Sequence, residues 1–295
     1  MDDDQNLFQA VKQWFFVSDL HGNLTRYQKL FRVITAERPA VVLLGGDLLP
    51  HGISRADIPA GTDFLNSVLV KGFMEVKSQL ALDYPEVLLI PGNDDCQAEE
   101  DDLLQAGSNG LWRSIHFKKA LAGEYTVYGY ACVPPTPFLL KDWERYDVSR
   151  YVDPGCIPPE DGWRSVTMPA NEIRHATIKA DLEKLAAETD LSRSIFLFHA
   201  PPYQTSLDRA ALDGRMIDNV PLDVHVGSIA IRRFILKRQP RITLHGHIHE
   251  SARLTGSWRE CLGQTWAFSA AHDGLELALI RFDPADPAGA MRELL

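Results

Sequence analysis

Short apolar runs alternate with amphipathic stretches along the first third of the chain. The runs at 14–17, 41–44 and 87–90 contain only apolar residues and are followed by Ser, Gly or Pro, which is typical of buried strands. The stretches between them repeat apolar residues at helical spacing, first after residue 23 and again over residues 62–81. The order strand, helix, strand, helix, strand predicts an α/β fold.

The pattern changes after residue 123, where a predicted strand over 125–133 leads into a long irregular segment. Residues 134–169 contain seven prolines and four Trp or Tyr residues. A loop this long is usually functional or disordered, and its aromatic side chains favour an ordered lid or rim. We therefore predict one domain over residues 1–295, with a lid or rim insertion at 134–169. The remaining predicted elements are a helix over 178–185, a strand over 195–198, an irregular stretch over 201–227, a helix between Ser228 and Pro240, strands at 242–244, 265–268 and 275–282, and a peripheral tail from residue 284.

The composition narrows the class of protein. The 295 residues are 45% hydrophobic and 24% charged, as in an ordinary globular protein. The formal net charge of −10 disfavours a general nucleic-acid binder, because such proteins present a basic surface. The four cysteines form no C-x-x-C pair, so neither a zinc knuckle nor a disulfide framework is indicated. The acidic start lacks the lead of a signal peptide, and no apolar run approaches the roughly 18 residues of a membrane helix, so we expect a cytoplasmic protein.

Residues of the kind that bind metals follow five of the predicted strands, at the point where each strand ends. Open α/β sheets bind their ligands just beyond the carboxyl ends of the strands, so the five ends would meet at one crevice. Asp, Asn and His supply oxygen and imidazole nitrogen without thiolate, a donor set that suits Mn, Fe, Zn or Co. The five clusters are Asp19-Leu20-His21, Gly46-Asp47, Gly92-Asn93-Asp94-Asp95, His199 and Gly246-His247-Ile248-His249.

The spacing within the clusters supports a metal site. Asp19 and His21 stand two residues apart, as do His247 and His249, so both members of each pair can face one ion. Neighbouring glycines let the backbone turn sharply or approach closely. Taken singly, each cluster is more often a turn or a helix cap than a metal site. Five in this order, each after an apolar run, favour a metal centre, and a shared carboxylate would allow two ions about 3.5–4 Å apart.

The order of these clusters resembles the motif pattern of the calcineurin-like metallophosphoesterase superfamily, which is D-x-H, G-D, G-N-H-D/E, a lone His and G-H-x-H. The resemblance spans residues 14–249. It implies two facing β-sheets flanked by helices, in a four-layer α/β/β/α sandwich, and a dinuclear metal centre. It assigns Asp19, His21, Asp47 and His249 to one ion, and Asp47 as a bridge, Asn93, His199 and His247 to the other.

One position departs from the family pattern. The His of G-N-H-D/E, which is a transition-state and proton-transfer residue in many members, is replaced here by Asp94. Several members that lack this His resemble phosphodiesterases more than phosphomonoesterases. An ionised Asp94 would also repel a phosphate dianion more than a diester monoanion, so we predict a preference for phosphodiesters. We favour a supporting role for Asp94 over a role as general acid, with substrate binding as a further alternative.

Two other residues are candidates for contact with the substrate. His225 precedes a predicted helix start, where free N–H groups and the helix dipole attract phosphate, so it is the first candidate for proton donation or substrate contact. Asn23, beside His21, either reaches a phosphate oxygen or holds its own turn. His116 and His175 fit core or core-edge positions better than ligand positions.

The sequence therefore predicts a metal-dependent phosphoesterase in which a bridging hydroxide attacks phosphorus. Manganese is the first expectation for the two divalent ions, with Fe, Zn, Ni or Co as alternatives. The substrate would be a small phosphoester, with a nucleotide among the options, and we expect no membrane partner. One rival is a nuclease of the same superfamily, which the net charge disfavours. The other is a scaffold without catalysis, which the seven intact ligand positions disfavour.

Overall fold

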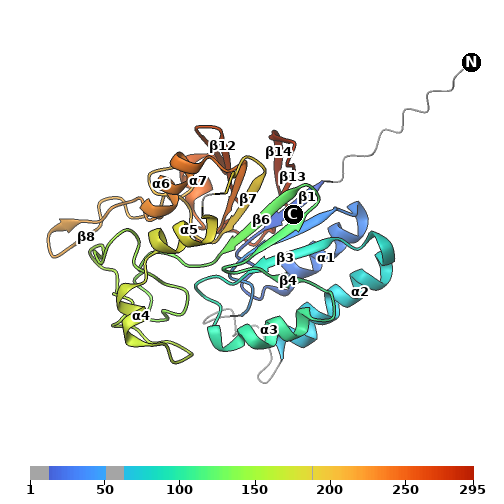
Figure 1. Cartoon of the computed structure of the whole chain (residues 1–295), viewed down its shortest axis with the longest axis horizontal. Helices are drawn as coiled ribbons and strands as arrows, with labels where there is room; N and C mark the ends of the chain where they lie inside the picture. Colours follow the sequence, from blue (N-terminus) through green and yellow to red (C-terminus); the bar gives the residue numbers. More distant parts are fainter. Residues whose placement is uncertain (1–12, 51–62, 188) are drawn as a thin grey trace, which may run out of the picture.

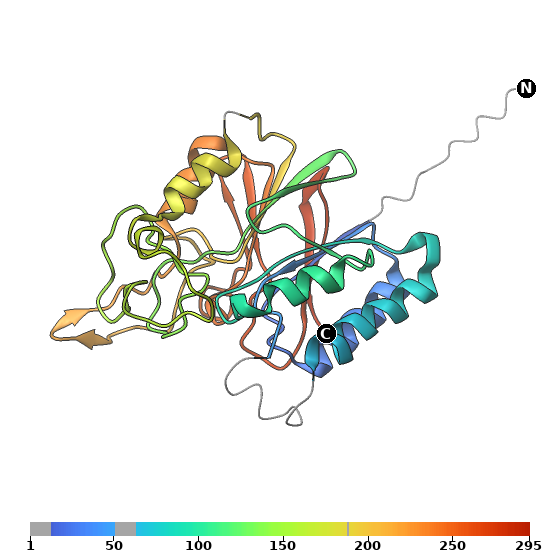
Figure 2. The same ribbon diagram turned by 60° about the horizontal axis from the view of Figure 1, so that its bottom comes forward.

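Two β-sheets face each other at the centre of the structure, and helices cover their outer faces (Figures 1 and 2). The computed structural model describes residues 13–50, 63–187 and 189–295. This arrangement confirms the predicted α/β sandwich of two sheets flanked by helices. In spatial order, the first sheet contains β14 (Asp286–Leu294), β13 (Ala278–Asp283), β1 (Trp14–Val17), β2 (Val41–Gly45), β3 (Glu86–Ile90) and β4 (Arg113–Ser114).

The second sheet also has six strands, and a separate two-stranded hairpin projects from the body of the molecule (Figure 2). The hairpin consists of β8 (Met216–Ile217) and β9 (Val220–Pro221). In spatial order, the second sheet contains β11 (Arg259–Leu262), β12 (Thr265–Ser269), β10 (Ile242–His245), β7 (Ser194–Phe198), β6 (Tyr125–Tyr130) and β5 (Lys119–Ala122).

The helices fall into two groups that pack on opposite sides of the paired sheets. Apolar side chains from α1 (Leu24–Glu37), α2 (Lys71–Leu80) and α3 (Glu100–Gly107) share a core with the first sheet. Those from α5 (Ile178–Ala186) and α6 (Ile229–Arg238) share a core with the second sheet. The shorter elements are a π-helical turn (Leu65–Val70), α4 (Ala170–His175), α7 (Ser251–Thr255) and 3-10 turns at Ala81–Asp83 and Gln97–Glu99.

The continuous apolar run of β1 reflects its burial on both faces. Phe15 and Val17 point into the core under α1 and α2, whereas Trp14 and Phe16 point into the core between the two sheets. Successive side chains of a strand alternate between its faces, so a strand between two cores has no polar position. The same reasoning applies to β2 and β3, which pair with β1 in parallel through the middle of the first sheet.

Parallel pairing brings the functional ends of the strands together. In the first sheet β1, β2 and β3 run parallel, and in the second β6, β7, β10 and β12 do so. All of the predicted metal-ligand residues follow β1, β2, β3, β7 or β10 directly or within a few residues. The sheet topology therefore gathers residues that are up to 230 positions apart in the sequence.

The structure corrects several predicted boundaries. The tail from residue 284 was predicted to be peripheral, but β14 pairs with β13 along the edge of the first sheet. Its small and polar residues carry little apolar alternation, so backbone pairing and not local pattern decides this strand. The predicted strand over 275–282 begins only at Ala278, where pairing with β14 starts, and Leu275 is 83% exposed. The predicted strand over 125–133 ends at Tyr130, and the start of the predicted helix at residue 62 lies outside the described residues.

The segment 134–169 is more firmly built into the protein than a detachable lid would be. Trp143 and Tyr146 are buried, and the buried Lys141 donates to Glu144 with Nζ 2.6 Å from Oε2. Asp147 accepts hydrogen bonds from two backbone N–H groups in the first turn of α6. The inner side of the segment therefore belongs to the body of the fold, and only its outer side is exposed.

None of the helices in the described parts of the chain is long and apolar enough to cross a membrane.

Candidate metal centre

Seven predicted ligand residues meet where the two sheets present their carboxyl ends. Four of them, Asp19, His21, Asp47 and His249, offer ligand atoms that all lie within 4.8 Å of one another. The other three predicted ligands adjoin this group. His199 Nε2 lies 3.3 Å from Asp47 Oδ2 and 3.0 Å from Asn93 Oδ1. The ring of His247 lies beside that of His199, with ring centroids 5.2 Å apart.

Asp47 occupies the position that a shared ligand would need. Its Oδ2 atom lies 3.7 Å from His21 Nε2 on one side and 3.3 Å from His199 Nε2 on the other. Its Oδ1 atom accepts a hydrogen bond from the backbone N–H of Asp94 at 2.8 Å. The carboxylate is therefore held in place by one oxygen while the other faces both groups of ligands.

Four of the seven residues have left-handed backbone conformations. The φ angles are 57° at Asp19, 46° at His21, 53° at Asp47 and 74° at His247. Such angles are costly for residues other than glycine and persist only where the surrounding structure imposes them. Other residues of the described chain share this conformation, but these four bring their side chains to one place, which is consistent with a functional site.

Glycine in the motifs gives these side chains room. A Cβ atom at Gly92 would collide with the Asp47 side chain, and one at Gly246 would collide with the Asp19 carboxylate. The glycines of the third and fifth predicted clusters thus provide space for the carboxylates.

Polar partners on the far side of the ring orient His199 and His21. His199 Nδ1 lies 2.8 Å from the carbonyl oxygen of Gly45, which can only accept, so Nδ1 carries the proton and Nε2 faces Asp47. His21 places Nδ1 3.5 Å from Asp94 Oδ2 and Nε2 toward the cluster. His245 differs because both its nitrogens have partners, Ala200 O and Thr243 Oγ1, and it therefore belongs to the core.

The electrostatics of the cluster fit a cation. Asp19 is fully buried, and its Oδ2 atom has no hydrogen-bond partner, while Oδ1 accepts from the backbone N–H of His247. His21 Nε2 and His249 Nε2 approach to 3.1 Å, so two basic nitrogens converge on the same place as two carboxylates. Acceptors brought together in a buried site need a positive charge between them. The donor set, oxygen and imidazole nitrogen, suits a divalent transition metal.

The pKa values indicate that, without a metal ion, a protonated histidine supplies the positive charge beside the carboxylates. Burial alone raises the pKa of Asp47, but the neighbouring charges of His199 and His21 outweigh it and hold the pKa well below its usual range. Burial likewise opposes protonation of His199, yet Asp47 raises the pKa of that imidazole to about 10. Ligand histidines must be unprotonated to bind metal, so loading the site releases protons.

Asp95 joins the loops that carry Asp47 and Asn93. Its buried carboxylate accepts hydrogen bonds from the backbone N–H groups of Leu48, Leu49 and Gly92 at 2.8–3.1 Å. Trp143, from the 134–169 segment, donates its indole N–H to the Asp95 carbonyl at 2.6 Å. The segment therefore packs directly against the loop that follows β3.

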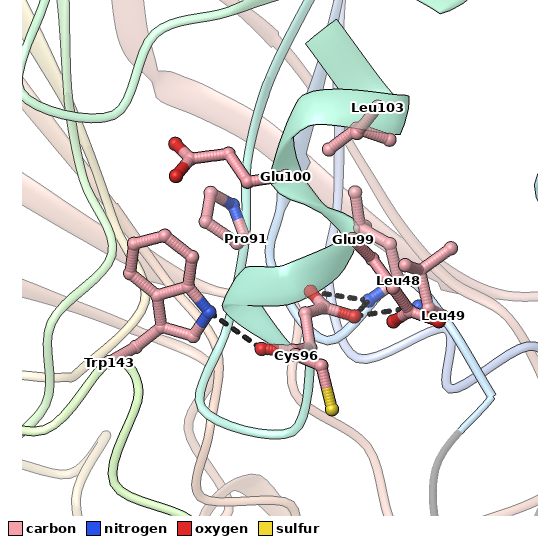
Figure 3. Close-up of a pocket in the computed structure, with 9 residues that line it drawn as sticks. Leu48, Leu49, Pro91, Cys96, Glu99, Glu100, Leu103 and Trp143 are labelled. Carbon is pink, nitrogen blue, oxygen red and sulfur yellow. Dashed lines mark hydrogen bonds between the residues drawn. The ribbon is translucent and has the colours of Figure 1, made fainter. Parts of the chain in front are cut away.

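Figure 3 shows a pocket beside this junction, between α3 and the indole of Trp143. Its lining is mostly apolar and includes none of the seven predicted ligands. The pocket thus lies next to the Asp–His cluster and is distinct from it. Its lining residues are Leu48, Leu49, Pro91, Asp95, Cys96, Glu99, Glu100, Leu103 and Trp143.

Arg26 supports the cluster, although the sequence reasoning missed it. This buried guanidinium donates to the carbonyl oxygens of Asp19 and Gly274, each at 2.5 Å. It therefore ties the strained residue Asp19 to the loop that follows β12. A basic residue in the first turn of α1 opposes the helix dipole, which is the one sequence signal that marks Arg26 as unusual.

The structure gives Asn23 and His225 definite surroundings. Asn23 caps α1, with its side-chain oxygen accepting from Arg26 N at 3.1 Å, which is the turn-holding role; its contact with substrate stays a prediction. The helix start after His225 does not offer the free N–H groups that were expected, because the carboxylate of Asp147 already occupies them. His225 itself pairs with Asp208, with Nδ1 2.8 Å from Oδ1.

Comparisons with known proteins place this geometry in a wider context. The family model of the calcineurin-like phosphoesterases matches residues 15–251. The uncharacterized protein MJ1162 of Methanocaldococcus jannaschii is 27% identical over 240 residues, which cover 80% of this chain and 79% of that protein. The crystal structure of TT1561 of Thermus thermophilus is 18% identical, covers 96% of this chain and 99% of that one, and has a TM-score of 0.55. A dimetal phosphatase from Danio rerio is 12% identical, covers 92% of each chain and has a TM-score of 0.50. At these identities the two structures show a shared fold.

Proposed function

Because the chain belongs to the calcineurin-like phosphoesterase family, whose activity is metal-dependent hydrolysis of phosphoesters, we propose that it is a dinuclear enzyme that prefers phosphodiesters. The single observation that carries the preference is Asp94, which stands at the position of the family's proton-transfer His. We treat the whole chain as one catalytic domain, with the segment 134–169 and the loop 201–227 as the rim of its substrate site.

The proposed ligands divide into two sets that share Asp47. Support comes from the convergence of four ligand atoms within 4.8 Å and from the position of Asp47 between His21 and His199. Manganese remains our first choice of metal, although the donor set also suits Fe, Zn, Ni or Co. The first set is Asp19, His21, Asp47 and His249, and the second is Asp47, Asn93, His199 and His247.

Divalent ions in such a site bind phosphoryl oxygens and lower the pKa of water. The protein prepares the ligands that would hold them. The Gly45 carbonyl fixes the tautomer of His199, and Asp94 faces the outer nitrogen of His21 at 3.5 Å. The backbone N–H of Asp94 holds one oxygen of Asp47 and leaves the other free for binding.

Asp94 supports a diester preference through its charge. Its side chain is 28% exposed and faces a ligand histidine, so it adds negative charge at the mouth of the cluster. A phosphomonoester carries nearly two negative charges near neutral pH and a diester only one. At about 6 Å and an effective dielectric constant near 20, one additional unit charge costs about 3 kcal/mol, and solvent screening reduces this to about a tenfold effect on relative rates.

A matched pair of substrates tests the proposal. Bis-p-nitrophenyl phosphate and p-nitrophenyl phosphate share one leaving group and differ in charge, so a change in the ratio of their kcat/KM values on substitution of Asp94 reports the effect of its charge. We expect Mn²⁺-loaded wild type to prefer the diester, and Asp94→Asn, which keeps the shape, to shift the ratio toward the monoester by about tenfold. Asp94→His should shift the ratio in the same direction, since it also removes the negative charge of Asp94.

Two results would contradict the proposal. If wild type prefers the monoester, the proposed diester preference is wrong. If the ratio is unchanged in Asp94→Asn, Asp94 is not the cause of the preference. Metal content measured on the same samples shows whether the substitution has instead disturbed His21. A fully metal-loaded wild type that is inactive on every phosphoester would contradict the enzyme assignment as a whole.

A further inference from the structure

Hydrolysis of an ester with a poor leaving group requires a proton donor for the departing oxygen. Asp94 stands at the motif position that would hold a His, and its carboxylate faces His21. The other motif side chains either converge on the metal cluster or, like Asp95, hold backbone N–H groups. A proton donor must therefore come from outside the motifs.

His225 and Asp208 form a fixed pair on the loop 201–227. Asp208 is fully buried, and its carboxylate accepts from the backbone N–H groups of Gln204, Thr205 and Gly227 at 2.9–3.1 Å. The same carboxylate lies 2.8 Å from His225 Nδ1. A carboxylate held by three N–H groups cannot turn away, so it keeps the Nδ1 proton of His225 directed inward. Nε2 is then the ring nitrogen that can meet a substrate, and the His225 side chain is 29% exposed.

The loop is tethered beside both second-sheet ligand segments. It begins just after His199, where Tyr203 N–H donates to the carbonyl of Ser228 at 3.0 Å. The backbone of His225 pairs with that of Arg209 in an isolated β-bridge. Two residues after Arg209, the backbone N–H of Ala211 donates to Glu250 Oε1 at 2.9 Å. Glu250 directly follows the predicted ligand His249. The loop that carries the pair is therefore anchored at two places, one just after β7 and one just after β10, each within a few residues of a predicted ligand.

A second carboxylate fixes the backbone of His225. Asp223 accepts from the backbone N–H of His225 at 2.8 Å and from the hydroxyl of Tyr203 at 2.5 Å. The ring of Tyr203 lies 6.2 Å from that of His225, roughly perpendicular to it at 75°. Both the main chain and the side chain of His225 are thus held, as expected of a group that must meet one atom of a substrate.

We propose that His225 donates a proton to the leaving oxygen of the substrate, and that Asp208 is its positioning residue. The proposal rests on the proposed phosphodiesterase function and deepens it. As water adds to phosphorus, the bond from phosphorus to the leaving oxygen breaks, and the proton of His225 Nε2 passes to that oxygen to give an alcohol. The proton that the attacking water loses returns through solvent to His225, so atoms and charge balance over one turnover.

Leaving-group dependence tests the proposal, because a proton donor matters least for activated aryl groups. The substrates are methyl phosphodiesters with p-nitrophenyl, phenyl and alkyl leaving groups, assayed with Mn²⁺-loaded enzyme. His225→Asn can keep the hydrogen bond to Asp208 but has no Nε2. We expect it to retain most of its kcat/KM on the p-nitrophenyl ester and to lose about 10²–10⁴-fold on the alkyl ester. Asp208→Asn should show the same selectivity with a smaller loss.

Controls separate donation from a structural role. His175→Asn changes an exposed histidine at the end of α4 and should leave all rates unchanged. Metal content and the midpoint of thermal unfolding should be the same in His225→Asn and wild type. Added imidazole should partly restore alkyl-ester hydrolysis to His225→Ala, which a defect of packing would not allow.

Each contrary result has one meaning. Equal losses on all leaving groups, no loss on any, or a loss of metal in His225→Asn would overturn the role of His225. A wild type that hydrolyses only the p-nitrophenyl ester would overturn it too, since a working donor serves poorer leaving groups. If metal-loaded wild type hydrolyses none of the esters, the proposed function itself fails.

Discussion

Asp47 lies between the two proposed metal sites, so its removal should affect both ions, whereas removal of His21 should affect one. Both residues have left-handed backbone angles, 53° and 46°. Glycine adopts this conformation without strain, so Asp47→Gly and His21→Gly delete each side chain and leave the backbone relaxed. Arg38→Gly is the matched control, because Arg38 has a φ of 50° at the end of α1 and an exposed side chain that pairs with Asp83 and belongs to none of the motifs.

The expected magnitude follows from the number of ions that each side chain serves. Loss of a partner that merely supports a ligand weakens metal binding by about 10–100-fold, so loss of a ligand itself should cost at least about 100-fold per ion. At free Mn²⁺ about tenfold above the wild-type Kd, wild type and Arg38→Gly would then hold about 1.8 ions per chain. His21→Gly would hold about one ion, and Asp47→Gly about 0.2.

Equilibrium dialysis followed by elemental analysis measures these values directly. Circular dichroism spectra of the metal-free variants show whether each remains folded. Equal metal content in Asp47→Gly and His21→Gly would refute the reasoning that Asp47 is shared. Full occupancy in Asp47→Gly would refute its assignment as a ligand.

Arg26→Ala should lower Mn²⁺ affinity by about 10–100-fold in the same dialysis assay, because Arg26 holds the carbonyl of Asp19 although it is no ligand itself. Arg26→Lys should recover part of the loss. Unchanged affinity in both variants would show that Asp19 needs no such support. His116→Gln should make the unfolding free energy less dependent on pH. Burial, with help from Arg145 and Lys118, lowers the pKa of His116 to about 3 from 6.5, so between these values the unfolded chain binds a proton that the folded protein does not. Wild-type stability should therefore fall as the pH falls below 6.5. Urea unfolding between pH 6.5 and 5 should show that the unfolding free energy changes with pH less steeply in the variant, by up to about 1.4 kcal/mol per pH unit. Identical slopes in wild type and variant would mean that His116 is protonated when folded. Trp163→Ala, on the exposed side of the 134–169 segment, should change KM between substrates and leave metal content unchanged, whereas identical kinetics on every substrate would place this side of the segment away from the substrate.

Local pattern was sufficient for the elements that are buried on both faces. The runs that became β1, β2 and β3 have no polar position, because each face of these strands meets a core. The polar residues that follow them form the cluster because parallel strands end at the same edge. Both the α/β class and the convergence of Asp19, Asp47 and His199 could thus be predicted from short stretches of sequence.

Contacts between distant parts of the chain could not be predicted in this way. β14 is held by pairing with β13 and has little apolar alternation of its own. From the sequence, the first turn of α6 was a candidate site for phosphate. In the structure its backbone N–H groups donate instead to Asp147, some 80 positions earlier. Prolines and aromatics suggested a lid or rim at 134–169, and whether Trp143 within it faces solvent or the Asp95 carbonyl depends on the neighbouring loop.

Arg26, which holds the carbonyl of Asp19, belongs to this second class. It also donates to the carbonyl oxygen of Gly274, which folding brings to it from the loop after β12. The sequence by itself determined which side chains meet at the proposed metal centre, because each motif residue lies close to the end of its own strand. Only the tertiary structure decided what orients those side chains, because hydrogen bonds between loops have no periodic signature in the sequence.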